Sequence, residues 1–468
     1  MSVPFTGEEL LRWTGGRSIG GELEGTRFAG VSINTRTLAA GELFVAIRGE
    51  VHDAHRFLSN AAESGAGALM VEEAWLAENA LPGELPGVAV PDTTAALGAL
   101  AAGYRSRFEG PVVAITGSNG KTTTKEMCHR ILSVAAPCLK NQGNLNNEFG
   151  LPLTLLSREP EQRAAVVELG MNHRGEIARL AAIARPDVGV ITNIGTAHIE
   201  YLGSREEIAR EKADLIAALG RDGVAVLNRD DDYVMSQADR APGRVLTYGR
   251  SAEADVRADD VRFEEGGAYA FQLRSPQGDV AIRIHGLAET TVINALAAGA
   301  AALAAGVSLE AVAEGLGQHD QVPGRMACSE LSNGVRVIDD TYNANPQSMK
   351  NALESLARLK GAGRGFAVLG DMGELGEAAE SAHRDAGRTA AEQGIDFVFA
   401  LGERAELVAE GAREAGMEAS RVLVGKTPEE LCDGVRKQMG AGDWILVKGS
   451  RAMRMERVVE ALVAGENT

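Results

Sequence analysis

PVVAITGSNGKTTTKE, residues 111–126, is the stretch that decides the fold of this chain. The apolar run 112–115 predicts a buried strand, and a helical pattern begins at Lys121. In a glycine-containing loop between such elements, backbone N–H groups converge on phosphate oxygens and the helix offers the positive end of its dipole. Lys121 would add a positive charge and Thr122 a hydroxyl for Mg²⁺. The candidate phosphate-binding residues are Thr116, Gly117, Ser118, Asn119, Gly120, Lys121, Thr122 and Thr123.

The spacing of this loop departs from the common phosphate-loop pattern G-x-x-x-x-G-K-[ST], which would require glycine where Ile115 stands. The chain carries the shorter G-x-x-G-K-T form. An ordinary glycine-rich turn between a strand and a helix is the alternative explanation, and the strand-loop-helix context favours phosphate binding.

Composition and length restrict the class of protein. A chain of 468 residues exceeds what one hydrophobic core supports and predicts about three domains. The net charge of −18 argues against a nucleic-acid or anionic-membrane surface. Four scattered cysteines without a C-x-x-C pair predict neither a zinc site nor disulfides. No signal peptide or apolar membrane span is evident, so we expect a cytoplasmic protein without membrane insertion. We also expect a monomer.

Strand and helix patterns alternate along the chain and predict an α/β protein with three domains. Residues 1–108 mix short strands with helices and end in an alanine-rich helix. Residues 109–322 carry strands at 111–116, 164–168, 188–194 and 224–227, helices at 121–134 and 205–219, and an antiparallel hairpin around the turn 275–278. Residues 323–468 repeat the alternation, with a last helix at 451–464, and predict a doubly wound, Rossmann-like domain. Ligands should bind at the carboxyl ends of the parallel strands.

Polar side chains follow several of these strands. Glu168 ends one strand and His198 lies just after the next, so both should meet Thr122 at one sheet edge, where Mg²⁺ binds with few protein ligands. Each residue taken singly is also typical of an ordinary surface position.

Four loops carry further candidates for binding, and each is also compatible with an ordinary turn or solvated loop. They hold Asn144, Asn146 and Asn147 in the central domain, Asp340, Asn343 and Asn345 in the third domain, and Ser32, Thr35, Arg36, Asp53 and His55 in the first domain.

A family resemblance appears once these motifs are read together. TGSNGKTTTKE, NQGNLNNEFGLPLTLL, VVELGMNHRGEI, TNIGTAHIEYLGS, PGRM, DDTYNANPQSM, LGDMGELG and VKGSRAMRMERVV resemble the Mur ligases, from about residue 30 to 459. The motifs DDTYNANPQSM and LGDMGELG resemble the branch that joins D-alanyl-D-alanine to UDP-N-acetylmuramoyl-tripeptide. The phosphate loop is shared with the whole ligase family.

The resemblance implies an N-terminal domain for the UDP-sugar, a central ATPase and a closing C-terminal domain. It implies that ATP phosphorylates the tripeptide carboxylate and that the dipeptide amine attacks the acyl phosphate, in peptidoglycan precursor synthesis.

The resemblance also implies roles for individual residues. Lys121 would hold the β- and γ-phosphates, Thr122 and Glu168 one Mg²⁺, and His198 a second. Lys212 matches the lysine that the family carbamylates to make an anionic Mg²⁺ ligand; by sequence alone it is typical of a solvated helix lysine. The implied nucleotide contacts are Asn294, Arg325, Asp340 and Asn343. The implied UDP-sugar contacts are Ser32, Thr35, Arg36, Asp53 and His55.

The chain departs from the family pattern at three places. Thr290-Thr291 stand where relatives carry a histidine before Asn294, Asn34 replaces an aspartate, and Ala54 replaces a glycine. Two other functions stay open: a family ligase that uses a different amine acceptor, and a phosphate-loop NTPase that works as a switch without ligation. The 343–346 loop favours a ligase, because a switch needs no second substrate site.

Overall fold

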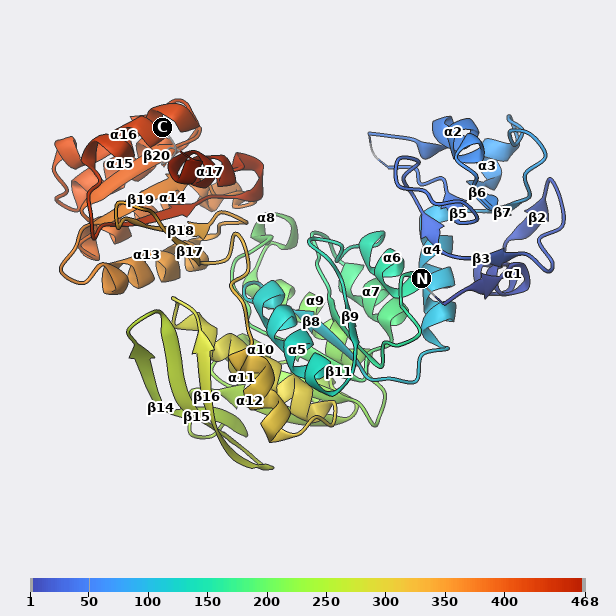
Figure 1. The fold of residues 1–468 in the computed structure, drawn as a ribbon, viewed down its shortest axis with the longest axis horizontal. Helices are drawn as coiled ribbons and strands as arrows, with labels where there is room; N and C mark the ends of the chain where they lie inside the picture. The colour runs from blue at the N-terminus through green and yellow to red at the C-terminus, as the bar shows by residue number, and fades with distance from the viewer. Residues whose placement is uncertain (1–2, 50, 465–468) are drawn as a thin grey trace.

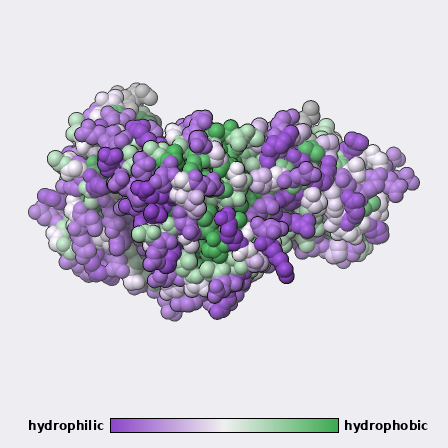
Figure 2. Space-filling model, turned by 90° about the horizontal axis from the view of Figure 1, so that it is seen from below, coloured by the Kyte–Doolittle hydropathy of each residue, from purple (hydrophilic) through white to green (hydrophobic). Residues whose placement is uncertain are grey.

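The computed structural model describes residues 3–49 and 51–464, which form three lobes arranged along the chain (Figure 1). The N-terminal lobe and the C-terminal lobe lie on either side of the central one. Figure 2 shows that hydrophilic residues predominate on the face seen from below, and that apolar residues gather in a strip near its middle. Within the described residues, no helix is long and apolar enough to cross a membrane.

The N-terminal lobe is built on a five-stranded sheet in the order β2-β7-β6-β5-β4, in which only β2 is antiparallel to its neighbour. A small antiparallel pair, β1 and β3, lies beside it. The elements are β1 (Phe5–Thr6), α1 (Gly7–Thr14), β2 (Arg17–Ile19), β3 (Arg27–Phe28), β4 (Val31–Ser32), β5 (Leu43–Val45), η1 (Ala54–Phe57), α2 (Leu58–Glu63), β6 (Ala68–Glu72), α3 (Glu73–Leu76), β7 (Gly87–Val90) and α4 (Thr93–Arg105).

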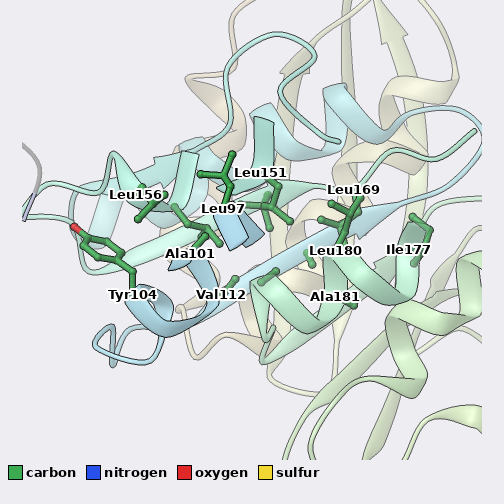
Figure 3. Close-up of a cluster of buried hydrophobic side chains, with 14 of the residues drawn as sticks. Leu97, Ala101, Tyr104, Val112, Leu151, Leu156, Leu169, Ile177, Leu180 and Ala181 are labelled. Carbon is green, nitrogen blue, oxygen red and sulfur yellow. The ribbon is translucent and has the colours of Figure 1, made fainter. Parts of the chain in front are cut away.

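Helix α4 joins the N-terminal lobe to the central one. Its N-terminus is capped by Asp92, which accepts hydrogen bonds from the N–H groups of Thr94 and Ala95. Figure 3 shows Leu97, Ala101 and Tyr104 of this helix packed among apolar side chains of the central domain. The alanine-rich sequence therefore makes a connecting helix that shares a core with the domain after it.

The central lobe contains a nine-stranded sheet in the order β16-β15-β14-β13-β12-β11-β8-β10-β9. Neighbouring strands from β9 to β14 in this order are parallel. The pairs β14–β15 and β15–β16 are antiparallel, as the hairpin pattern predicted. The elements are β8 (Val112–Thr116), α5 (Lys121–Ala135), β9 (Cys138–Lys140), α6 (Gly150–Leu156), β10 (Ala164–Glu168), α7 (Glu176–Ala184), β11 (Val188–Ile191), α8 (Ile199–Leu202), α9 (Arg205–Ala217), β12 (Val224–Asn228), α10 (Asp232–Met235), η2 (Ala238–Arg240), β13 (Arg244–Gly249), β14 (Val256–Glu264), β15 (Ala268–Ser275), β16 (Gly278–His285), α11 (Thr290–Ala304) and α12 (Leu309–Gly317).

Strand β8 is buried on both faces, which explains its continuous apolar sequence. Side chains alternate across a strand, so Val112 and Ala114 pack in the core with α4, α6, α7 and α9. Val113 and Ile115 pack on the other face with α5, α11 and α12. Burial on both sides fixes the register of β8 and therefore the position of the loop that follows it.

The C-terminal lobe has a six-stranded sheet in the order β17-β18-β22-β19-β20-β21, parallel except for β17. Helices cover both faces, which confirms the predicted doubly wound arrangement. The elements are β17 (Ala327–Glu330), β18 (Arg336–Asp340), α13 (Pro346–Lys360), β19 (Gly365–Gly370), η3 (Gly376–Ala378), α14 (Ala379–Glu392), β20 (Phe397–Leu401), α15 (Ala405–Glu414), η4 (Ala419–Arg421), β21 (Val422–Gly425), α16 (Pro428–Gln438), β22 (Trp444–Lys448), η5 (Arg451–Met453) and α17 (Glu456–Ala464).

Two predicted boundaries are wrong for identifiable reasons. The strand predicted at 188–194 ends at Ile191, because the residues after it leave the sheet to bind the phosphate loop. The helix predicted at 451–464 is interrupted, because Arg454 has a left-handed backbone (φ 48°) between η5 and α17. We propose that the domains are 1–108, 109–322 and 323–468, since each contains one main sheet.

Candidate active site between the central and C-terminal domains

A cavity of about 870 Å³ lies where the phosphate loop of the central domain faces the C-terminal domain. Most of the site residues predicted from sequence line it. They are Ser118, Asn119, Gly120, Lys121, Thr123, Asn144, Asn146, Asn147, Glu168, His198, Asn294, Arg325, Asp340, Asn343 and Asn345. Tertiary folding therefore gathers loops from sequence positions 118 to 345 around one space.

The glycines of the phosphate loop are required by its backbone. Gly117 (φ 149°) and Gly120 (φ 80°) have conformations that L side chains rarely adopt. A Cβ on Gly117 would lie 1.8 Å from Thr192 Oγ1, and one on Gly120 would lie 2.4 Å from Asn294 Oδ1. Neither residue can therefore be replaced without moving its neighbours.

The segment after β11 holds the phosphate loop in place. The Ser118 N–H donates to the Asn193 carbonyl at 2.9 Å, and the Asn119 N–H donates to Asn193 Oδ1 at 3.0 Å. The Thr192 hydroxyl donates to the Asn119 carbonyl at 2.6 Å. These contacts hold the loop in one conformation, which lowers the entropy cost of binding phosphate.

Lys121 begins helix α5 and folds back over the loop. Its Nζ donates to the carbonyl oxygens of Gly117 at 2.9 Å and Ser118 at 3.4 Å. Burial lowers the pKa of the Lys121 amine, Glu168 opposes this shift, and Arg325 adds to it. Arg325 is therefore a second cation that an anionic ligand at the loop would meet beside Lys121.

Glu168 is a buried carboxylate beside the loop. Its side chain accepts a hydrogen bond from the Thr122 hydroxyl at 2.8 Å and from Asn146 Nδ2 at 2.9 Å. No described residue forms an ion pair with it. Lys121 and Lys212 are near enough for their charges to interact with Glu168 but do not pair with it directly, so its oxygens can also accept a bound cation. The predicted meeting of Glu168 and Thr122 is confirmed.

The donor set suits Mg²⁺ better than a metal held by protein alone. In the part of the chain that the structure describes, no group of three or more His, Cys, Asp or Glu side chains could hold a metal. One carboxylate and one hydroxyl, completed by phosphate oxygens and water, is the usual pattern for Mg²⁺.

Lys212 lies on α9 and is 1 % exposed, so the interpretation as a solvated helix lysine is wrong. Among described residues, no hydrogen bond or ion pair reaches its amine. Burial lowers the pKa of Lys212 well below its ordinary value, and the charge of Lys121 adds to this shift, whereas Glu211 and Glu168 oppose it. Lys212 does not line the cavity, although it lies close enough to Lys121 and Glu168 for their charges to act on its amine.

His198 lines the cavity and contacts the C-terminal domain. Its Nδ1 lies 2.6 Å from Oε2 of Glu374, which follows β19. The contact with His198 lowers the pKa of the Glu374 carboxyl. Glu374 was not predicted as a site residue, although it belongs to the LGDMGELG motif.

The C-terminal domain supplies a second set of contacts. Arg325 Nη2 donates to the Thr122 hydroxyl at 3.2 Å, and its guanidinium lies 4.0 Å from the centre of the Tyr342 ring. Lys448 is 2 % exposed, and its Nζ donates to Asp340 Oδ2 at 2.6 Å and to the Asn343 carbonyl at 3.0 Å. Sequence reasoning missed Lys448, and its place at the end of an apolar strand was the available signal.

Asn345 has two structural partners. Its Oδ1 caps α13 by accepting a hydrogen bond from the Ser348 N–H, and its Nδ2 donates to Asn119 Oδ1 at 2.7 Å. The same side chain therefore ends the loop after β18 and binds the phosphate loop.

The site residues predicted in the N-terminal domain do not line the cavity. They are Ser32, Thr35, Arg36, Asp53 and His55. The His55 ring is buried and uses both nitrogens, with Nδ1 2.6 Å from Asp53 Oδ1 and Nε2 accepting from the Glu72 N–H at 3.1 Å. Asp53 and His55 thus shape their own loop, whereas Arg36 is exposed.

Comparison with known families covers most of the chain. The Mur ligase family, catalytic domain, matches residues 27–105; the Mur ligase middle domain matches 115–302; and the Mur ligase, glutamate ligase domain, matches 324–451.

Individual relatives and solved structures agree with these matches. The UDP-N-acetylmuramoyl-tripeptide–D-alanyl-D-alanine ligases of Escherichia coli strain K12 and Bacillus subtilis strain 168 are each 37 % identical. The alignments cover 95 % of this chain and 96 % of the first relative, and 94 % of both chains for the second. MurF from Acinetobacter baumannii has a TM-score of 0.89 and 35 % identity, with 99 % of each chain covered. MurF from Thermotoga maritima in complex with ADP has a TM-score of 0.83 and 29 % identity, covering 94 % of this chain and 98 % of that one. This chain therefore belongs to the Mur ligase family, and these relatives place it with the UDP-N-acetylmuramoyl-tripeptide–D-alanyl-D-alanine ligases.

Proposed function

We propose that this chain is an ATP-dependent ligase that joins D-alanyl-D-alanine to UDP-N-acetylmuramoyl-tripeptide in peptidoglycan precursor synthesis. The names of its relatives support the two substrates, and the ADP complex of the Thermotoga maritima protein supports the nucleotide. The observation that carries the proposal is the cavity in which a phosphate loop, a buried carboxylate and a wall from the C-terminal domain face one another. A nucleotide and an amine substrate can meet there.

The reaction transfers one phosphoryl group and forms one amide bond. The tripeptide carboxylate attacks the γ-phosphorus of ATP, the bond to the β-phosphate oxygen breaks, and ADP leaves. The amine of D-Ala-D-Ala then attacks the acyl phosphate, loses a proton and expels inorganic phosphate. Catalysis of such a transfer depends mainly on positioning and charge neutralisation.

The chain's own residues supply that positioning. Residues 116–123 would hold the phosphates, with the Lys121 amine released from the Gly117 carbonyl to the γ-phosphate. Asn294, Arg325, Asp340 and Asn343 would contact the nucleotide. Thr122, Glu168 and His198 would bind Mg²⁺, which neutralises phosphate charge when it is present.

Lys212 would complete the metal site as a carbamate. A lysine attacks CO₂ only as the neutral amine, and the lowered pKa of Lys212 favours that form. Its buried amine lacks a described hydrogen-bond partner, and a carbamate would carry an anionic oxygen toward the metal.

The remaining predicted residues would contact the other parts of the two substrates. Ser32, Thr35, Arg36, Asp53 and His55 would serve the UDP-sugar, with exposed Arg36 pairing with its diphosphate and Asp53 and His55 supporting the loop. Asn144, Asn146, Asn147 and Asn345 would contact the peptide substrates. We also infer that the protein works in the cytoplasm as a monomer.

The test is a ligation assay with purified protein, ATP, Mg²⁺ and UDP-N-acetylmuramoyl-tripeptide, scored by the mass of the product. We expect D-Ala-D-Ala to be condensed at least tenfold more efficiently than D-Ala, because the shorter acceptor leaves buried polar groups unpaired. Equal use of D-Ala or L-glutamate would indicate a family ligase with another acceptor. ATP hydrolysis without any condensed product would indicate an NTPase switch.

A further inference from the structure

Two residues with unusual backbones meet across the interface of the central and C-terminal domains. His198 (φ 64°) and Glu374 (φ 60°) are two of six described non-glycine residues with positive φ. His198 Nδ1 and Glu374 Oε2 are 2.6 Å apart. Non-glycine residues in this region are strained and persist where surrounding structure imposes the conformation, often at functional sites.

The loop that carries Glu374 is held in place by buried residues of the C-terminal domain. Met372 and Leu375, on either side of it, are buried in the C-terminal core. The Met372 N–H donates to Nε2 of buried His383 at 2.9 Å, and His383 Nδ1 donates to the Ala379 carbonyl at 2.6 Å. The C-terminal domain therefore presents Glu374 in one position.

Asp371 strengthens the same support. Its carboxylate accepts hydrogen bonds from the N–H groups of Glu403 at 2.8 Å and Arg404 at 3.2 Å. The loop from β19 is thereby tied to the residues just before α15. Glu374 itself remains free to face the central domain.

His198 depends on this carboxylate. Its Nδ1 is buried and makes no other hydrogen bond to a described residue, so the 2.6 Å approach to the Glu374 carboxylate is the polar contact of this nitrogen within the described chain. An imidazole whose Nδ1 faces a carboxylate keeps its proton there and leaves the Nε2 lone pair available. Carboxylates orient metal-binding histidines in this way in many proteins.

We propose that Glu374 is a positioning residue that the C-terminal domain supplies to His198. Closure of this domain would then orient the His198 ring of the central domain for metal binding. The proposal rests on the proposed function, because it takes His198 as a ligand of Mg²⁺. It predicts that metal binding and domain closure favour each other. An open domain would leave His198 without the group that orients it.

Glu374→Gln tests the proposal, since it keeps the shape of the side chain and removes its charge. Affinity for Mn²⁺ is measured by electron paramagnetic resonance with a non-hydrolysable ATP analogue and no peptide substrate. We expect a loss of about tenfold or more, as for other carboxylates behind metal ligands. Glu377→Gln, an exposed change three residues away, should leave the affinity unchanged.

A second measurement separates positioning from a general loss of structure. Glu374→Gln in a His198→Ala background should cause no further loss of Mn²⁺ affinity, since both changes act on the same contact of His198 with the metal. In the metal-free protein, ¹⁵N shifts of the His198 ring should show the proton on Nδ1 in wild type and a mixture in Glu374→Gln. Unchanged Mn²⁺ affinity in Glu374→Gln, or additive losses in the double variant, overturns the proposal. The Mn²⁺ measurement contains no peptide substrate, so its result does not depend on whether the ligation assay succeeds.

Discussion

The Asn345 amide nitrogen donates to Asn119 Oδ1 at 2.7 Å, which joins the start of α13 to the phosphate loop across 226 positions of sequence. Because the same side chain also caps α13, the helix cannot move away from the phosphate loop without losing this contact. The position of the C-terminal domain is thus linked to the site at which the nucleotide is proposed to bind.

Asn345→Ala should lose both the cap and the interdomain hydrogen bond. Loss of an N-cap costs about 1 kcal/mol, which thermal unfolding will detect. Asn345→Ser is the matched control, because serine caps helices but is too short to reach Asn119. We expect Asn345→Ser to keep most of the stability while both variants raise the KM for ATP; equal KM values in all three proteins would contradict the link.

Lys121→Ala should abolish ligation without unfolding the protein. The transferred phosphoryl group loses its nearest fixed charge, a loss on the order of 3 kcal/mol or more in transition-state stabilisation. Turnover is measured by product mass, and folding by circular dichroism. A folded variant with near wild-type turnover would refute the assignment of the phosphate loop.

Lys212→Ala should be inactive and partly rescued by a short carboxylic acid such as acetate. The acid would replace the anionic oxygen that a carbamate supplies. Lys212→Arg is the matched control, because it keeps a positive charge and cannot form a carbamate, and acetate should not rescue it. Full activity of Lys212→Ala without added acid would show that the carbamate is not needed.

Arg358→Ala should loosen the C-terminal domain. The Arg358 guanidinium donates to the Tyr269 hydroxyl and the Leu287 carbonyl, and lies 4.6 Å from the centre of the Phe263 ring. These three partners belong to the central domain. We expect a larger radius of gyration by small-angle X-ray scattering, with no change for Arg388→Ala, whose ion pairs stay within the C-terminal domain.

His319 should make the protein less stable in acid. Burial lowers the pKa of His319 from 6.5 to about 4. Between these values the unfolded chain binds more protons, so the free energy of unfolding falls as pH decreases from 6.5 to 4. At about 1.4 kcal/mol per pH unit, the effect is on the order of 3 kcal/mol at pH 4.

His319→Gln removes this proton uptake. Urea unfolding of both proteins at pH 7 and pH 4 should show that wild type loses more stability than the variant. Parallel pH dependence in the two proteins would show that His319 is not buried in its neutral form.

Local patterns in the sequence determined much of the architecture. The apolar run of β8, the glycine pattern after it and the alternation of strands and helices predicted the parallel sheets and the phosphate loop. These features depend on neighbouring residues, so a short stretch carries the information. The predicted meeting of Thr122 and Glu168 also held, and His198 lines the same cavity as Glu168, because carboxyl ends of parallel strands meet at one edge.

The tertiary structure decided the environment of individual side chains. The sequence around Lys212 is typical of a surface lysine. Only the packing of helix α9 in the folded chain shows that the Lys212 side chain is buried. Glu374 and Lys448 reach the site from the C-terminal domain, and only the folded chain shows which groups they contact there. Burial, the pKa and ion pairing depend on groups that are distant in sequence, and a domain interface brings such groups together only when the whole chain has folded.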